Sequence, residues 1–263
     1  MKRTLPILCF ALLAFVVACG GDNDGGTSDA LDIFFAPENA DALAHASLPT
    51  AADLPGGGWE VTGQDDFGDD DADEGFDFEA FAASEPACSQ LTALVNVGGL
   101  FGSSDEELPA GRAQIEFESV TPESLLPNSV EVEVEIEETA AEVQGAWNLV
   151  KDLFESDRTE ACMLAVFNQV FGGLADEDLK VEVEAAQASS DAPNNGATMA
   201  FDLHLDITGI ELDMAMEMYL WPYGNAKVTT TFIGTPDSVN GDLTGPALDA
   251  VVEKLEAAAA SGG

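Results

Sequence analysis

One short stretch of this sequence has a composition that suggests calcium binding. From Asp69 to Gly75 the chain is almost entirely acidic, with carboxylates at the first, third and fifth positions of a possible loop. A calcium loop of the EF-hand type requires glycine where Glu74 stands, and a bidentate glutamate where Ala80 stands. We therefore predict a charged surface loop here, with weak divalent cation binding as the alternative.

A second acidic group includes one of the two histidines. Asp202, His204 and Asp206 alternate with apolar residues, so they share the polar face of a predicted strand. Residues two positions apart lie ~6.5–7 Å from one another along a strand, too far for all three to chelate one small ion. We predict no metal site and no cofactor here.

Recognisable catalytic motifs do not occur in the sequence. It has no GxSxG, no closely spaced Cys–His pair and no glycine-rich phosphate loop. His45 lies in an alanine-rich polar segment and offers no base for a nucleophile. We therefore predict that the protein is not an enzyme.

Methionines gather on one predicted strand. Its apolar face consists of Leu212, Met214, Met216, Met218 and Leu220. Methionine adapts to irregular partners, so this face could line a cavity for an apolar ligand or a lipid. The alternative is a core face covered by a helix.

Glutamates alternate with apolar residues in other predicted strands. They are Glu116 and Glu118, the four from Glu131 to Glu137, and Glu182 with Glu184. If these ladders lie across one sheet face, directly opposed like charges weaken pairing by up to ~1 kcal/mol each. We interpret the face as solvated and salt-tolerant, with a cation-binding surface as the alternative.

Hydrophobic periodicity places these residues on an α+β fold. Period-two alternation predicts strands, and apolar residues at helical spacing behind capping residues predict helices. The predicted fold is a single domain, an antiparallel sheet with one face covered by helices. The predicted strands are 59–63, 113–120, 130–137, 179–185, 198–208, 210–221 and 226–234, and the predicted helices are 37–46, 84–97, 139–154, 157–171 and a terminal helix from Pro246.

The N-terminus has the pattern of an export signal. Lys2 and Arg3 precede an apolar run, 5–18, that is too short to span a bilayer. The run ends in Val-Val-Ala-Cys, which resembles the lipobox of bacterial lipoproteins. That resemblance implies cleavage before Cys19 and attachment of a diacylglycerol to its sulfur. The alternative is an ordinary secretory signal that contains a cysteine.

The signal divides the chain into three predicted parts. Residues 1–18 form the signal peptide, 19–30 a polar, flexible tether, and 31–263 an extracytoplasmic domain. We expect lipid-anchored attachment to the cell membrane or outer membrane, facing the periplasm or exterior. In that oxidising location Cys88 and Cys162 form an even pair, which predicts a disulfide between two helices.

Charge excludes one class of partner. Of the eight basic residues, two precede the predicted cleavage site, which leaves six against 50 acidic residues and a formal charge of −44. No basic patch is present to neutralise phosphates, so nucleic acid is excluded as a partner. Because the acids are spread along the whole chain, we favour adaptation to high salt, with a merely soluble surface and cation binding as the alternatives.

Short motifs in the predicted domain suggest a family. The proline- and glycine-rich segment 48–59, Cys88 before a helix, and 224–231 ahead of the last helix resemble the extracellular sensor domains of actinobacterial receptor kinases and their lipoprotein relatives. The resemblance implies a sheet with a cleft, ligand sensing and no catalytic residues. We therefore expect a non-catalytic envelope protein that binds a small ligand or another envelope protein, with a carrier of an apolar ligand as the alternative.

Overall fold

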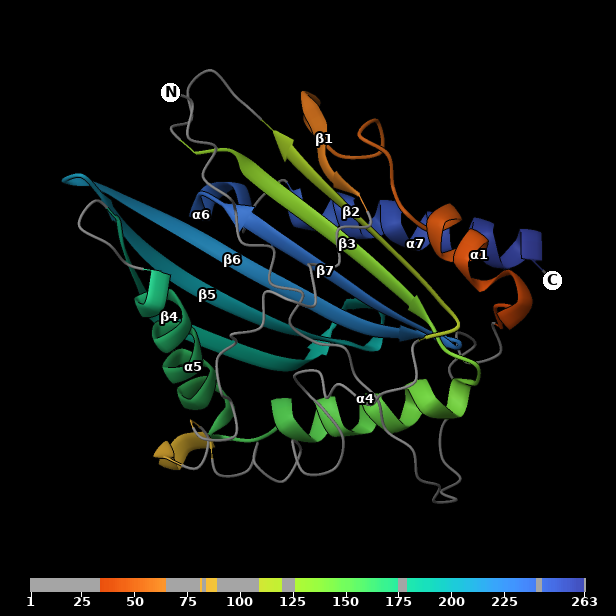
Figure 1. The fold of residues 1–263 in the computed structure, drawn as a ribbon, viewed down its shortest axis with the longest axis horizontal. Helices are drawn as coiled ribbons and strands as arrows, with labels where there is room; N and C mark the ends of the chain where they lie inside the picture. Colours follow the sequence, from red (N-terminus) through yellow and green to blue (C-terminus); the bar gives the residue numbers. More distant parts are fainter. Residues whose placement is uncertain are drawn as a thin grey trace.

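The structure is a computed structural model, and it describes residues 34–64, 81, 84–88, 109–119, 126–174, 179–239 and 243–262. They form one seven-stranded antiparallel sheet with helices packed on it (Figure 1), which confirms the predicted α+β class. The strands are β1 (Trp59–Gln64), β2 (Gly111–Ser119), β3 (Asn128–Ile136), β4 (Leu179–Ala192), β5 (Gly196–Ile207), β6 (Ile210–Tyr223) and β7 (Ala226–Gly234). The α-helices are α1 (Ala40–Ala46), α4 (Ala140–Phe154), α5 (Thr159–Leu174), α6 (Pro236–Ser238) and α7 (Thr244–Gly262), and the 3-10 helices are η2 (Pro37–Asn39), η4 (Pro86–Cys88) and η5 (Pro193–Asn195).

The strand order is β1-β2-β3-β7-β6-β5-β4. Two meanders, β1 to β3 and β4 to β7, therefore meet where β3 pairs with β7. The tight turn between β5 and β6 consists of Thr208 and Gly209, whose φ angles are 54° and 85°. Positive φ at both central residues suits the right-handed twist of a two-residue hairpin.

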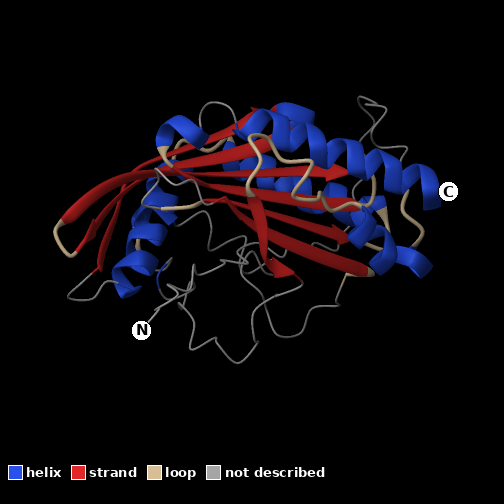
Figure 2. Ribbon diagram, turned by 90° about the horizontal axis from the view of Figure 1, so that it is seen from above, coloured by secondary structure: helices blue, strands red, loops and turns tan. Residues whose placement is uncertain are grey.

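One face of the sheet packs against α1 and α7. Alternate residues of β3, from Val130 to Ile136, are fully buried there. They join the apolar side of α7, including Val251 and Leu255, in one hydrophobic cluster. Figure 2 shows the helix that ends at the C-terminus lying along one side of the strands.

The opposite face packs against α4 and α5. Its cluster contains Phe201 of β5, the β6 methionines, and Val166 and Phe167 of α5. The sequence assigned helices to one face, and the structure adds a helical layer on the second face as well. The reason is that β6 is apolar on both sides. Ala215, Trp221 and Tyr223 lie in the first cluster, and Met214, Met216, Met218 and Leu220 lie in the second.

The capping box predicted at the start of α4 is confirmed. The Thr139 hydroxyl accepts a hydrogen bond from the Glu142 backbone N–H at 3.3 Å, and the Glu142 carboxylate accepts one from the Thr139 N–H at 2.8 Å. These bonds satisfy donors that a helix N-terminus otherwise leaves unpaired. They fix the point at which the chain leaves β3 and enters α4.

A buried asparagine holds the first described residues against the sheet. Asn225, in the turn between β6 and β7, accepts a hydrogen bond from Phe35 N–H at 2.7 Å. Its side-chain amide donates to the Phe35 carbonyl at 3.0 Å and to the Glu137 carbonyl at 2.7 Å. The N-terminal segment is thus fixed to the β6–β7 turn and to the end of β3.

Two side chains of α5 form hydrogen bonds with backbone groups of the edge strand β4. The Asn168 amide accepts from the Val183 N–H and donates to the Val183 carbonyl, each at 2.9 Å. Glu160 accepts from the Ala188 N–H at 3.2 Å. Because unpaired edge groups attract other strands, these contacts protect this edge of the sheet.

The predicted signal peptide, the predicted tether and the acidic loop 69–75 lie outside the described residues, as does the predicted helix beyond Cys88. Within the described residues, none of the helices combines the length and apolar character needed to span a membrane.

Candidate functional site

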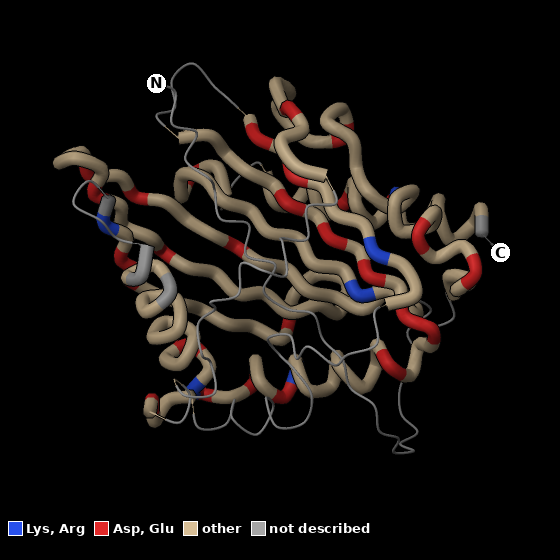
Figure 3. Tube along the Cα trace, viewed as in Figure 1, with Lys and Arg blue, Asp and Glu red and all other residues tan. Residues whose placement is uncertain are grey.

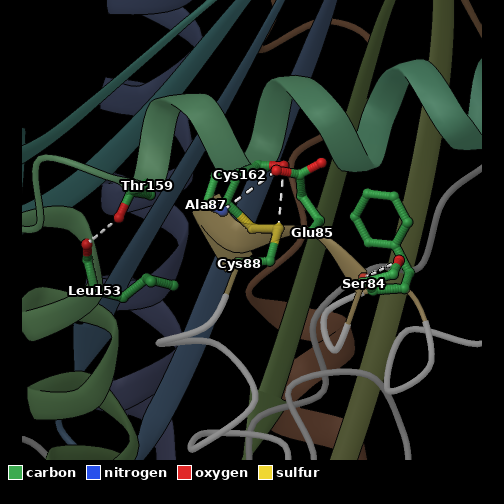
Figure 4. Close-up of a disulfide and its surroundings, with 8 residues drawn as sticks. Ser84, Glu85, Ala87, Cys88, Leu153, Thr159 and Cys162 are labelled. Carbon is green, nitrogen blue, oxygen red and sulfur yellow. Dashed lines mark hydrogen bonds between the residues drawn. A yellow bond between two sulfur atoms is a disulfide. The ribbon is translucent and has the colours of Figure 1, made fainter.

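The predicted disulfide is confirmed: Cys88 and Cys162 are bonded. Cys88 ends η4 and Cys162 lies in the first turns of α5, as Figure 4 shows. Both residues are buried in the cluster beneath α4 and α5. The bond joins segments 74 residues apart, so its role is to fix α5 in place.

The glutamates of β2 and β3 and the methionines of β6 lie on the same face of the sheet. The register between β2, β3, β7 and β6 aligns their side chains in rows. In this order the rows are Arg112–Glu135–Lys227–Pro222, Gln114–Glu133–Thr229–Leu220, Glu116–Glu131–Thr231–Met218 and Glu118–Ser129–Ile233–Met216. The face therefore changes across the strands from charged at β2 and β3, through threonine at β7, to apolar at β6.

The third glutamate ladder lies on the opposite face, which corrects the expectation of one shared face. Glu182 is the register partner of His204, whereas Val183 beside it packs against the α5 cluster. The side chain of Glu182 must therefore point away from α5, since neighbouring strand residues face opposite sides.

The methionine face is packed as core. Met214, Met216 and Met218 are 9%, 6% and 6% exposed and lie in the cluster beneath the helices. Leu220, at the end of the same row, is also buried, but it additionally lines a groove. This packing favours the core interpretation for the three methionines. Leu220 is the residue of this strand face that also borders the groove.

A shallow groove lies between α4 and the strands β6 and β7, and its space of about 340 Å³ is partly open to solvent. Its helical wall includes Val143, Trp147 and Val150, and its floor includes Leu220, Pro222, Lys227 and Thr229. Apolar lining with a few polar groups is typical of small-molecule sites.

A network of ion pairs borders the groove floor. Arg112 contacts Glu133 at 2.5 Å and Glu135 at 3.3 Å. Lys227 contacts Glu135 at 2.8 Å and Glu137 at 2.6 Å. Figure 3 shows how few basic positions lie among the acidic ones on the tube. Each basic side chain of the network is therefore shared between two carboxylates.

These carboxylates are not solvated, which corrects the expectation of a wet strand face. Glu133 and Glu135 are 9% and 4% exposed. The physical reason is that Arg112 and Lys227 supply the charge-assisted hydrogen bonds without which buried carboxylates would be expelled into water. The alternation of valine and glutamate predicted strand β3 and its two faces, but it did not predict that both faces are buried.

Burial changes the titration of this face. Burial, reinforced by the charge of Glu133, raises the pKa of Glu131 to about 7, although Gln114 donates a hydrogen bond to its carboxylate. Burial and the neighbouring Glu135 likewise raise the pKa of Glu133. Burial alone would lower the pKa of Lys227, but the charges of Glu135 and Glu137 outweigh it and raise that pKa. Glu131 and Glu133 therefore keep their protons to a higher pH than ordinary glutamates do.

The structure does not bring Asp202, His204 and Asp206 together around one point. His204 Nδ1 lies 2.9 Å from a carboxylate oxygen of Asp213 on β6, and this hydrogen bond raises the pKa of His204. Asp206 instead accepts from the Gly209 N–H at 2.8 Å. Among the described residues, no group of three His, Cys, Asp or Glu side chains could hold a metal ion.

The groove and its border were only partly visible in the sequence. The glutamates of 131–137 were singled out, but Trp147, Pro222, Lys227 and Thr229 were not assigned a role. The available signal was Lys227, which like Lys180 is a basic residue inside a predicted strand of an otherwise acidic chain. No protein-family model matches the chain, and the search of curated proteins found no match.

Proposed function

We propose that this chain is a lipid-anchored, non-catalytic protein of the cell envelope, whose folded domain binds a small ligand in the groove between α4 and the strands β6 and β7. The groove is the observation that carries the proposal, because it combines apolar walls with charged side chains at one border. Cys19 would carry the lipid, and the domain would act by binding or sensing rather than by chemistry.

The N-terminal pattern supports the location. Phe35, the first residue that the described fold holds by hydrogen bonds, is the sixteenth residue after Cys19. A flexible segment of that length has an average end-to-end distance of about 22 Å and a maximum near 55 Å. The domain would therefore remain close to the membrane surface but free to rotate beside it.

The position of the groove supports binding near the membrane. Pro222 and Lys227, which line the groove, flank the turn that contains Asn225. Asn225 also forms hydrogen bonds with Phe35. Phe35 lies close in sequence to the predicted tether. The groove would thus lie at the end of the domain where the tether joins it.

A carrier of an apolar ligand remains the second candidate. It is favoured by one observation, namely that Leu220 belongs both to the apolar face of β6 and to the groove lining. In this case a longer apolar ligand would displace α4 from the sheet and reach the methionines behind Leu220.

Two mass measurements test the proposal. The full chain would be expressed in a bacterium with its signal, extracted in mild detergent and analysed intact, with Cys19→Ser as the control. The proposal expects a mature chain that begins at Cys19 and carries acyl groups, whereas the Cys19→Ser chain stays unlipidated. Native mass spectrometry of the same preparation then asks for a co-purifying small molecule.

The outcomes separate the two parts of the proposal. An unlipidated wild-type chain overturns the anchor. A bare chain, combined with no binding across a library of small envelope metabolites, overturns ligand binding. Loss of a co-purifying molecule after Ala146→Phe, which fills the groove, supports the site, whereas retention of that molecule places it elsewhere.

A further inference from the structure

The edge strand β1 is held by its first residue and by its backbone. Trp59 is buried, and its indole N–H donates a hydrogen bond to the Pro55 carbonyl at 2.7 Å. Beyond Trp59 the strand buries little, because Val61 is 52% exposed and the polar side chains around it are exposed as well. As the terminal strand β1 pairs with β2 alone, and its register shifts between Val61 and Gly63. The pairing of residues 60–64 therefore rests on backbone hydrogen bonds, with little apolar burial to support them.

Carboxylates of β1, β2 and β3 stand opposite one another on one face of the sheet. Glu60 is the direct register partner of Glu118, and Glu116 is that of Glu131. The Glu116 carboxylate also reaches over β1, since a β-carbon built on Gly63 would lie 3.1 Å from one of its oxygens. The β-carbons of directly opposed strand residues lie ~4.5–5.5 Å apart, and like charges at that distance oppose pairing. The repulsion therefore acts on the strand that has the least other support.

Basic side chains do little to offset this repulsion. Arg112 is the one basic residue in the described strands β1, β2 and β3, and it contacts Glu133 and Glu135. Glu118 lies about 20 Å from Arg112 along β2, at ~3.3 Å per residue. Burial and the charge of Glu116 raise the pKa of Glu118. Screening of the pair between Glu60 and Glu118 must therefore come from dissolved ions.

Salt controls the range of this repulsion. The Debye length is about 10 Å at 0.1 M, which exceeds the separation of the opposed side chains, and about 3 Å at 1 M, which is shorter. The centre of the sheet has other support, because the fully buried side chains of Val130, Val132 and Val134 hold β3 in the core. A change in ionic strength should therefore act on residues 60–64 before it acts on β3.

We infer that residues 60–64 form a salt-dependent strand, which pairs with β2 in molar salt and detaches from it at low ionic strength while Trp59 stays buried. Detachment makes β2 the edge of the sheet and leaves its backbone groups between Ile115 and Glu118 without a neighbouring strand. This conformational switch is separate from the groove and does not rest on the proposed function.

Hydrogen–deuterium exchange tests the inference on the full chain in neutral detergent, at pH 8, in 0.05 M and in 2 M KCl. Mass spectrometry follows peptides that contain residues 60–64, and peptides from β3 serve as the internal reference. Relative to β3, residues 60–64 are expected to exchange at least fivefold faster in 0.05 M than in 2 M KCl. The ratio to β3 removes the effect of salt on the chemistry of exchange itself.

Reversal of one charge gives the most direct variant. In Glu60→Lys an ammonium group stands opposite Glu118, so salt screens an attraction and the dependence on KCl should be lost or reversed. Glu60→Gln removes the repulsion without replacing it and should at least halve the fold-change. Glu155→Gln removes the same unit of charge from the exposed C-terminal cap of α4. It is the matched control and should behave as the wild type does.

Each alternative result contradicts a different step. Exchange of residues 60–64 that is equally fast, or equally slow, in both salt concentrations overturns the inference, because pairing of β1 would then not depend on ionic strength. Parallel changes in residues 60–64 and in β3 overturn it by showing that salt acts on the whole domain. An unchanged salt dependence in Glu60→Lys overturns the assignment of the effect to the pair between Glu60 and Glu118.

Discussion

The pH dependence of stability provides the sharpest test of the buried carboxylates. Glu131 lies between Glu116 on β2 and Thr231 on β7, on the face that carries Glu133 and Glu135. We predict that Glu131→Gln stabilises the protein at pH 8 and leaves its stability nearly unchanged at pH 4.5. Glutamine keeps the shape of glutamate and can still accept the hydrogen bond that Gln114 donates.

The magnitude follows from the titration of Glu131. Its pKa rises from 4.5 to about 7 on folding, which at about 1.4 kcal/mol per pKa unit amounts to at most about 3.5 kcal/mol. Partial exposure of the side chain lets water and salt screen the charge, so we expect about 2 kcal/mol. The native carboxyl holds its proton more tightly than the unfolded one. The stabilising contribution is therefore complete below pH 4.5 and is lost as the pH rises through about 7.

Urea unfolding at constant ionic strength, followed by circular dichroism from pH 4.5 to 8.5, measures this difference. The wild-type free energy of unfolding should fall across that range, and Glu131→Gln should reduce the fall by about 2 kcal/mol. Glu138→Gln removes the same unit of charge from an exposed position beyond the end of β3 and should leave the fall unchanged. Parallel curves for wild type and Glu131→Gln would refute the argument that burial of this carboxylate opposes its ionisation.

Three further substitutions test other parts of the fold. Thr230→Val should raise the free energy of unfolding by about 1 kcal/mol, because the Thr230 hydroxyl is fully buried without a hydrogen-bond partner among the described residues. Reduction of the Cys88–Cys162 disulfide should lower that free energy by roughly 4 kcal/mol, since the bond closes a long loop. Asn225→Ala should lower it by about 3 kcal/mol, because two buried hydrogen bonds to Phe35 and a partly buried one to Glu137 are lost. Urea unfolding measures all three effects.

Matched changes separate these effects from general damage. Thr229→Val, on the other face of β7 and partly exposed, should give less stabilisation than Thr230→Val, and equal gains would point to β propensity instead. The Cys88→Ser/Cys162→Ser protein should not respond to dithiothreitol. Asn148→Ala on the exposed side of α4 should cost less than 1 kcal/mol, and a similar cost for Asn225→Ala would contradict its role in fixing the N-terminal segment.

Local periodicity predicted most of the elements, because each strand or helix records in its own residues which side is buried. The alternation at 130–137 corresponds to β3, and the capping box at Thr139 marks the start of α4. The strand predicted at 179–185 was too short, since β4 continues to Ala192. Residues 186–190 have no strong alternation, and it is pairing with β5 and contacts with α5 that keep them extended.

The site could be predicted only in fragments, because periodicity assigns a face within one strand but does not say which strands are neighbours. The pairing of β3 with β7 brings Lys227 between Glu135 and Glu137, about 90 residues away in sequence. Pairing of β7 with β6 then sets Lys227 beside Pro222, one row from Leu220. The amphipathic border of the groove therefore results from the order of the strands in the sheet. It could not be predicted from the sequence of β3, β6 or β7 taken alone.

The protection of one sheet edge by α5 limits how this protein can assemble. Asn168 and Glu160 already occupy backbone groups of β4, whereas β1 is the terminal strand on the other side of the sheet. Among the described residues, β1 therefore offers the one unprotected edge, and a molecule with one such edge can add a strand from one partner and no more. Association through the sheet would therefore stop at a pair of molecules, and growth into a fibre would first require α5 to leave β4, which the Cys88–Cys162 bond opposes.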